Sequence, residues 1–259
     1  MKALPNLEAS GALAIAECLS RISGGRVLDV GTGKGNFIEA LMKALESYDN
    51  FIGIDVTSKD LEKAQETFQK QPVQFMEMDA NHLGFADASF DTVCIANSLH
   101  HLANVPKVLS EMNRVLKPGG HFLVEEMYRD GKQTDAQHTD ILEHHWTAKI
   151  DRVQGITHHE TMTQNQIVNM LEALRFTNLE VLDSSRRVYC LFCSQRFECE
   201  DPKSESIIAS FLKGMDKTLD RLKSSERLPE IVAEAEKLKL RAKETGVASA
   251  SIFFVVGRK

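Results

Sequence analysis

The sequence of 259 residues contains no apolar run close to the roughly 20 residues that a membrane-spanning helix requires. Residues 13–19 are mildly apolar, but Glu17 interrupts them, and neither a basic segment nor a cleavage signal marks a secretory leader. The five cysteines are scattered, unlike the disulfide framework of a small secreted protein. These absences predict a cytoplasmic protein without a membrane partner.

An excess of positive charge is also missing. The formal net charge is -6, whereas a surface that binds nucleic-acid phosphates is basic. The charged segment 201–247 contains ten Lys and Arg and nine Asp and Glu, so it is not a basic arm. A nucleic-acid partner is therefore not expected.

What is present is an alternation of strands and helices. Apolar and β-branched runs predict strands over residues 26–30, 51–57, 73–80, 90–98, 121–127, 179–185 and 249–259. Alternating strands and helices imply right-handed βαβ units with a ligand at the carboxyl ends of the strands. The predicted fold is therefore α/β, with a doubly wound, mostly parallel, seven-stranded Rossmann-like sheet.

Two helical insertions interrupt this alternation. The first follows the fifth strand and occupies residues 129–176, including a polar helix from about residue 134 to 152. The second occupies residues 201–247, before the last strand; its apolar positions could pack on the core, cover the cleft or form a homodimer contact. With an N-terminal helix in residues 1–24, both insertions are expected to belong to one domain, residues 1–259.

The strongest chemical signal is the loop VLDVGTGKGNF (residues 27–37). Gly31, Gly33 and Gly35 permit backbone conformations and a close ligand approach that a Cβ would block. Asn36 stands where a dinucleotide fingerprint has its third glycine, which counts against NAD. Asp55 ends the second strand, where a carboxylate could accept hydrogen bonds from both hydroxyls of a ribose.

Four motifs between about residues 26 and 124 resemble the class I S-adenosylmethionine-dependent methyltransferases, in particular the small-molecule group with the ubiquinone/menaquinone type. The glycine loop is followed by DANHLGFADASFDTV (79–93), NSLHHL (97–102) and VLSEMNRVLKPGG (108–120), with Gly84 in place of the usual proline. The resemblance implies S-adenosylmethionine as cofactor, S-adenosylhomocysteine as product and a small-molecule acceptor. The alternatives are a nucleic-acid or protein methyltransferase, disfavoured because NSLH replaces (N/D)PP(Y/F), and a non-catalytic cofactor-binding module.

The resemblance also assigns residues to parts of the cofactor. The residues implied for the methionine half are Asp29, Gly31, Thr32, Gly33 and Gly35. Asp55 would hold the ribose, and Val56 would lie against the adenine ring. The remaining implied contacts are Asp79 and Ala80 with the adenine amino edge, and Asn97 and Ser98 with the sulfonium and its methyl group.

Methyl transfer by in-line displacement requires alignment, and it requires a base only if the acceptor must lose a proton. His100 and His101 follow the fourth strand, where the methyl group should emerge, so they are candidate catalytic residues together with His145. At the end of the fifth strand, Glu125 and Glu126 point to opposite sides, and Glu126 is the candidate acceptor contact.

The histidine-rich segment Ile141–Glu160 invites a metal interpretation, but it contains no HxxxH, and the adjacent His144 and His145 diverge by about 100° on a helix. Convergence would require the loop with His158 to fold back, so no metal is expected. His138 and His145 share a helical face, with Trp146 beside it. That face suits a lid that contacts the acceptor; a solvated helix is the alternative.

One CxxC pair, Cys190 and Cys193, has Cys199 nearby. Because no second pair or HxxxH accompanies it, buried or free thiols are expected rather than a zinc site.

Overall fold

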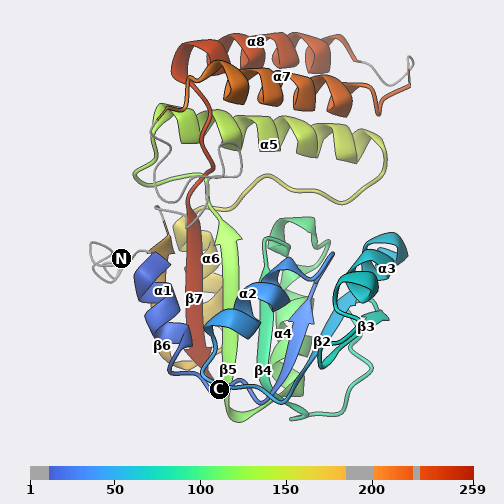
Figure 1. The fold of residues 1–259 in the computed structure, drawn as a ribbon, viewed down its shortest axis with the longest axis vertical. Coiled ribbons are helices and arrows are strands. Elements are labelled where there is room, and N and C mark those ends of the chain that lie inside the picture. Colours follow the sequence, from blue (N-terminus) through green and yellow to red (C-terminus); the bar gives the residue numbers. More distant parts are fainter. Residues whose placement is uncertain (1–11, 185–200, 224–227) are drawn as a thin grey trace.

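A seven-stranded sheet forms the centre of the computed structural model, which describes residues 12–184, 201–223 and 228–259 (Figure 1). The strand order is β3-β2-β1-β4-β5-β7-β6, and β7 runs antiparallel to β5 and β6 while the other pairs are parallel. The strands are β1 (Arg26–Val30), β2 (Asn50–Asp55), β3 (Val73–Glu77), β4 (Phe90–Ala96), β5 (Leu116–Met127), β6 (Thr177–Ser184) and β7 (Ile252–Arg258). The predicted fold class is confirmed.

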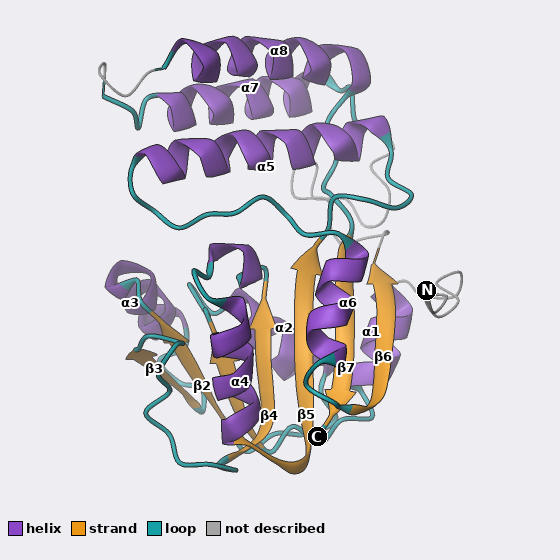
Figure 2. Ribbon diagram, turned by 180° about the vertical axis from the view of Figure 1, so that it is seen from behind, coloured by secondary structure: helices purple, strands orange, loops and turns teal. Residues whose placement is uncertain are grey.

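Helices cover both faces of this sheet because the central strands are apolar on both sides. On one face, α1 (Ala12–Leu19) and α2 (Asn36–Ala44) pack on the sheet, and α3 (Ser58–Thr67) lies beside β2 and β3. On the other face lie α4 (Val105–Val115) and α6 (Gln164–Glu172), as Figure 2 shows. The sheet is thus the middle layer of three.

A separate helical layer lies beyond the carboxyl ends of the parallel strands (Figure 1). It consists of α5 (Asp135–Val153), α7 (Glu205–Leu219) and α8 (Pro229–Thr245). These helices share a core that includes Trp146 of α5, Phe211 of α7 and Leu238 of α8. The apolar side of α7 is therefore buried inside the chain. Within the predicted insertion 129–176, α5 packs with α7 and α8, whereas α6 packs on the sheet.

The observed boundaries of one helix and two strands differ from the predicted ones. The helix predicted near the N-terminus is described from Ala12 and ends at Leu19. Strand β5 begins at Leu116, before the KPGG segment, with a register shift against β4. The last strand begins at Ile252 instead of residue 249, because the preceding backbone bonds to side chains of α5; Ala250 N donates to Asp140 at 2.7 Å. Cys190, Cys193 and Cys199 lie outside the described residues.

Within the described ranges, no helix is both long and apolar enough to cross a membrane.

An ion pair on α4 clamps the loop that follows β3. Glu111 accepts a hydrogen bond from Leu83 N at 3.0 Å and pairs with Arg114 at 2.9 Å. Arg114 in turn donates to the carbonyl oxygens of Leu83 and Phe85, both at 2.8 Å. The hydrogen bonds from Arg114 hold the pKa of Glu111 at about 2. The motif at residues 108–120 therefore holds the motif at residues 79–93 in place.

We expect Glu111→Gln to lower the free energy of unfolding near pH 7 by about 2 kcal/mol, because a neutral amide loses the charge-assisted bonds. Because the folded pKa lies below the ordinary 4.5, this contribution is present above pH 4.5 and is lost as the pH falls toward 2. Urea unfolding at pH 7 and pH 3 measures both effects. The control is Glu39→Gln, whose pair with Lys43 is exposed and should contribute less than about 0.5 kcal/mol. Equal losses in the two variants at pH 7 would contradict the clamp.

Candidate functional site

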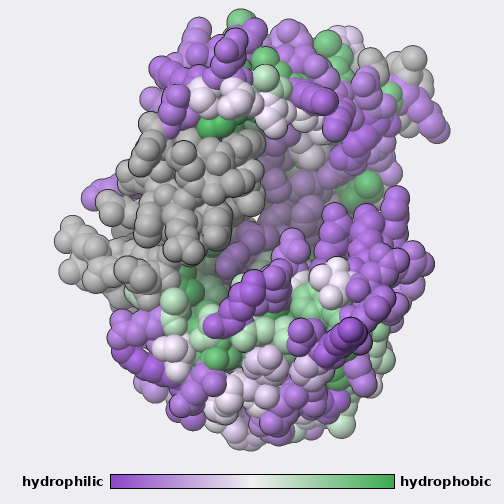
Figure 3. Space-filling view, viewed as in Figure 1, coloured by the Kyte–Doolittle hydropathy of each residue, from purple (hydrophilic) through white to green (hydrophobic). Residues whose placement is uncertain are grey.

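A cavity of about 400 Å³ lies at the carboxyl ends of β1 and β4. On the face shown in Figure 3, the surface is hollowed between the sheet and the helical layer. The residues lining the cavity are Asp29, Gly31, Thr32, Gly33, Lys34, Asn36, Phe37, Ala40, Asp60, Ala96, Asn97, Ser98 and Glu125. The structure thus gathers six of the predicted cofactor residues around one space.

The glycine loop has the left-handed backbone that its sequence predicts, with φ of 68° at Gly31, 51° at Gly33 and 83° at Gly35. A Cβ on Gly31 would lie 2.8 Å from Ser98 Oγ, and one on Gly35 would lie 2.7 Å from the ring of Phe68. A Cβ on Gly33 would meet no atom within 4 Å. Packing therefore requires glycine at positions 31 and 35. At position 33 the missing side chain leaves open space in the wall of the cavity.

Asp55 supports this loop directly. One carboxylate oxygen accepts from Gly33 N and the other from Thr57 N, each at 2.9 Å. Each oxygen keeps a further lone pair that a ribose hydroxyl could use. The next side chain, Val56, is 67% exposed and offers an apolar surface to a flat ring. Asp79, farther along this edge, is exposed and holds Asn81 N at 2.8 Å, with the half-buried Ala80 beside it.

Asp29 is buried, and its Oδ2 has no hydrogen-bond partner among the described residues. The same holds for Thr32 Oγ1. Burial, with a smaller contribution from the carboxylates of Asp55 and Glu125, raises the pKa of Asp29 to about 7. A ligand with a cationic amino group would supply the missing donor, so these residues fit the methionine end of S-adenosylmethionine.

The chain after β4 forms the opposite wall. Asn97 has a φ of 46°, which is uncommon outside glycine and marks local strain. Its backbone N donates to Glu125 O at 2.7 Å, and its side-chain amide donates to Glu125 Oε1 at 2.9 Å. Ser98 Oγ lies 3.2 Å from Gly31 O and joins this wall to the glycine loop. Of the two glutamates that end β5, Glu125 faces the cavity.

Glu126, the predicted acceptor contact, does not line the cavity. Its side chain is fully buried, accepts from Leu99 N at 2.9 Å and lies 2.6 Å from His100 Nδ1. His100 is itself buried, whereas His101 is exposed, with its ring 4.1 Å from that of His158. Glu126 therefore positions His100.

The predicted acceptor residues on α5 do not line the cavity. Trp146 is fully buried in the helical layer, and its Nε1 donates to Ile231 O at 2.9 Å. His145 Nε2 accepts from Thr161 N at 3.2 Å and lies 2.8 Å from the Thr161 hydroxyl, so it holds the segment that leads to α6. His138 is half-buried on the same helix.

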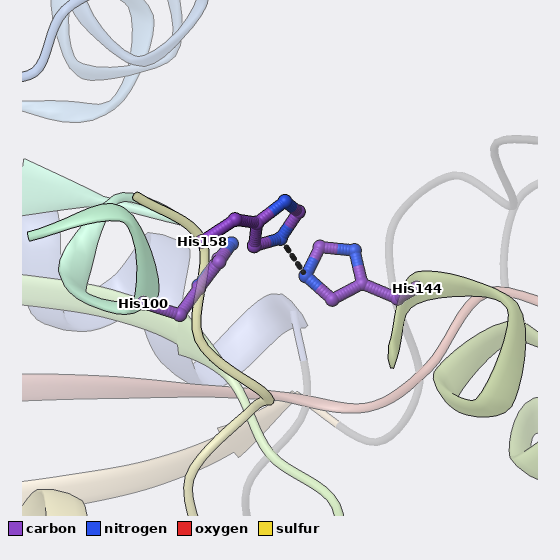
Figure 4. Close-up of side chains that lie close together, drawn as sticks. All are labelled: His100, His144 and His158. Atoms are coloured by element: carbon purple, nitrogen blue, oxygen red, sulfur yellow. Dashed lines mark hydrogen bonds between the residues drawn. The ribbon is translucent and has the colours of Figure 1, made fainter. Parts of the chain in front are cut away.

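His144, which the sequence offers only as a neighbour of His145, meets two other histidines (Figure 4). Its Nε2 lies 3.1 Å from His158 Nε2, and its ring centroid lies 4.8 Å from that of His100. Burial, followed by the neighbouring imidazoles with His100 and His158 foremost, lowers the pKa of His144 to about 2, so the ring is neutral near pH 7. The loop with His158 does fold back onto α5.

Residues 28–124 match the family model described as a methyltransferase domain. A demethylmenaquinone methyltransferase of Staphylococcus aureus is 42% identical over 98 residues, which is 38% of this chain and 41% of that one. An O-methyltransferase of Aspergillus nomiae is 34% identical over 120 residues, 45% of this chain and 52% of that one. The chain thus aligns with about half or less of these curated relatives. Over residues 28–124 the chain is therefore similar to methyltransferase domains.

The methyltransferase fold extends beyond the matched segment. A solved Bacillus halodurans structure, described as a candidate methyltransferase, covers 96% of this chain and 98% of its own, with a TM-score of 0.60 and 19% identity. At this identity the likeness shows the fold alone. The glycine loop, the unpartnered Oδ2 of Asp29 and the carboxylate of Asp55 fit S-adenosylmethionine.

We expect Asp55→Asn to weaken S-adenosylmethionine binding at least about tenfold, because it removes the charge that a pair of ribose hydroxyls would contact. The amide keeps the size of the side chain, which matters because Asp55 also holds Gly33 N. Calorimetric titration measures the affinity. The control is Asp49→Asn, an exposed carboxylate just before the other end of β2. Equal affinities for both variants would exclude the ribose contact.

We expect Asp29→Asn to raise the melting temperature of the cofactor-free protein at pH 8 by about 3 °C or more. Because the folded pKa of about 7 lies above the ordinary 3.8, the carboxyl of Asp29 lowers the stability progressively as the pH rises from about 4 to 7, and the full loss is present above pH 7. At pH 4 the two proteins should melt within about 1 °C of each other. The same variant should bind S-adenosylmethionine about tenfold more weakly. A difference in melting temperature that does not depend on pH would refute the buried charge.

Proposed function

We propose that this protein transfers the methyl group of S-adenosylmethionine to a small-molecule acceptor by in-line displacement. The observation that carries the proposal is the meeting of the glycine loop and the Asn97–Ser98 turn around one cavity. The glycine loop would hold the cofactor, and the Asn97–Ser98 turn would lie beside the methyl group of the cofactor. The cavity lies at the carboxyl ends of β1 and β4, and the surface between these ends and the helical layer is hollowed (Figure 3), which leaves that side for the acceptor.

The reaction is an attack on an already activated carbon, so alignment supplies most of the acceleration. Holding two reactants in line can be worth roughly 7–11 kcal/mol. The turn at Asn97 is fixed by two hydrogen bonds to Glu125, which keeps this wall rigid. A general base is needed only for an acceptor that must lose a proton, and His101 is the exposed candidate in the short helix that follows the turn.

The acceptor should be a small molecule. The Staphylococcus relative is a demethylmenaquinone methyltransferase and the Aspergillus relative is an O-methyltransferase, so carbon and oxygen acceptors both enter the proposal. We also propose a cytoplasmic protein that forms a homodimer. The apolar side of α7 is buried within the chain, so a dimer would use another surface, and light scattering after size-exclusion chromatography measures the mass.

The proposal is tested with labelled S-adenosylmethionine and a fractionated metabolite library, with products identified by mass spectrometry. We expect label in at least one small molecule, and none in RNA, DNA or protein. Tight cofactor binding without any labelled product would instead favour a non-catalytic module.

With the acceptor identified, we expect His145→Ala to raise its KM on the order of tenfold, because the variant frees the segment held through Thr161. The Kd for S-adenosylmethionine should change less than about twofold. The control is His121→Ala at the opposite end of the sheet. An acceptor KM that stays the same in both variants would remove His145 from the acceptor site.

A further inference from the structure

Three imidazoles from different parts of the fold converge beside the methyltransferase cavity (Figure 4). His100 belongs to the short helix Leu99–His101 after β4, His144 to α5, and His158 to the segment between α5 and α6. One ring nitrogen from each lies within 4.8 Å of the other two. We propose that His100, His144 and His158 bind a divalent transition-metal ion, zinc above all.

The distances suit such an ion. Zinc lies about 2.0–2.1 Å from a histidine nitrogen, so two ligands of a tetrahedral ion are roughly 3.3 Å apart. His144 Nε2 and His158 Nε2 already lie 3.1 Å apart. Without an ion, that contact needs a proton on one of the two nitrogens. An ion between them replaces the proton, and the third imidazole would have to approach by at most about 1.5 Å.

The surroundings orient two of the three rings. His100 Nδ1 lies 2.6 Å from Glu126 Oε1, and His158 Nδ1 lies 2.6 Å from Asp151 Oδ2. A metal-bound histidine commonly donates its other N–H to a carboxylate, which fixes the tautomer and strengthens the ligand. In both pairs this leaves the Nε2 lone pair free to bind a metal. The arrangement is thus two carboxylate–histidine pairs completed by His144.

The carboxylates are themselves held in place. Glu126 also accepts from Leu99 N at 2.9 Å, and Asp151 also accepts from Arg221. His100 and His158 are each only 3% exposed. Imidazole nitrogens are the ligands that zinc, copper, iron and nickel share, and a set of three histidines leaves a position for another ligand.

A role in catalysis rests on the proposed function. His100 is two residues from Ser98, which lines the cavity, so the metal would lie beside the acceptor. An acceptor hydroxyl or thiol in the remaining position would release its proton to water more readily. Its oxygen or sulfur would then form the bond to the methyl carbon as the S–CH₃ bond of the cofactor breaks. The electron pair of that bond stays on the sulfur, which gives S-adenosylhomocysteine.

The binding experiment uses the full-length protein after treatment with a chelator. Calorimetric titration with Zn²⁺ should give one ion per chain with a Kd of about 1 μM or tighter. Co²⁺ should give the visible absorption of a four- or five-coordinate site. We expect His144→Ala to weaken binding of both ions at least 100-fold, and Glu126→Gln to weaken it about 10–100-fold. The matched control is His159→Ala, an exposed neighbour of His158, which should bind as the unaltered protein does.

Absence of Zn²⁺ and Co²⁺ binding to the unaltered protein, or equal binding by His144→Ala, would overturn the metal site. Melting curves guard against a misfolded variant, since Zn²⁺ should raise the melting temperature of the unaltered protein and of His159→Ala but not of His144→Ala. Methyl transfer is measured separately. If methyl transfer is lost in the presence of a chelator and restored by Zn²⁺, the metal activates the acceptor. If a chelator leaves methyl transfer unchanged, activation of the acceptor by the metal is overturned. One bound ion without transfer to any acceptor would contradict the proposed function and leave the metal site standing.

Discussion

The buried carboxylate of Glu126 is the constraint on which both sites depend. A carboxylate without water is costly unless donors satisfy its oxygens, and here Leu99 N and His100 Nδ1 do so. The chain after β4 must therefore turn at once into a short helix above the end of β5. That turn places Asn97 in a left-handed conformation and brings Ser98 against Gly31. The wall of the cofactor cavity and the first histidine of the cluster thus share one anchor.

The sequence predicts what is local and misses what depends on distant packing. The glycines at 31, 33 and 35 predict a tight left-handed turn after a strand, because such a turn fixes its own local geometry. Trp146 was assigned to the acceptor side from the faces of α5 alone. The face that α5 buries is decided by α7 and α8, more than fifty residues later in the chain. His158 reaches His144 through a loop, for which helical periodicity carries no information.

The helical layer rests on the sheet through a few specific contacts. Ala250 N donates to Asp140 of α5, and Gln137 of the same helix donates to Ser249 O at 3.1 Å. His159 N donates to His100 O at 2.7 Å, so the segment before α6 is bonded to the turn after β4. An ion held by the histidine cluster would add a further link, because its ligands come from both layers. Metal binding and the position of α5 over the cavity would then be coupled.

Electrostatics connects the two sites. Asp29, Asp60 and Glu125 line the cavity, and an acidic lining favours a cofactor that carries a sulfonium and an ammonium. A divalent ion nearby would oppose that preference if its charge were uncompensated. Glu126 and Asp151 offset its two charges, while Arg221 beside Asp151 and Arg152, which donates to His158 O at 2.7 Å, each add one. A deprotonated acceptor would reduce this positive charge, so the site would favour the anionic form of the nucleophile.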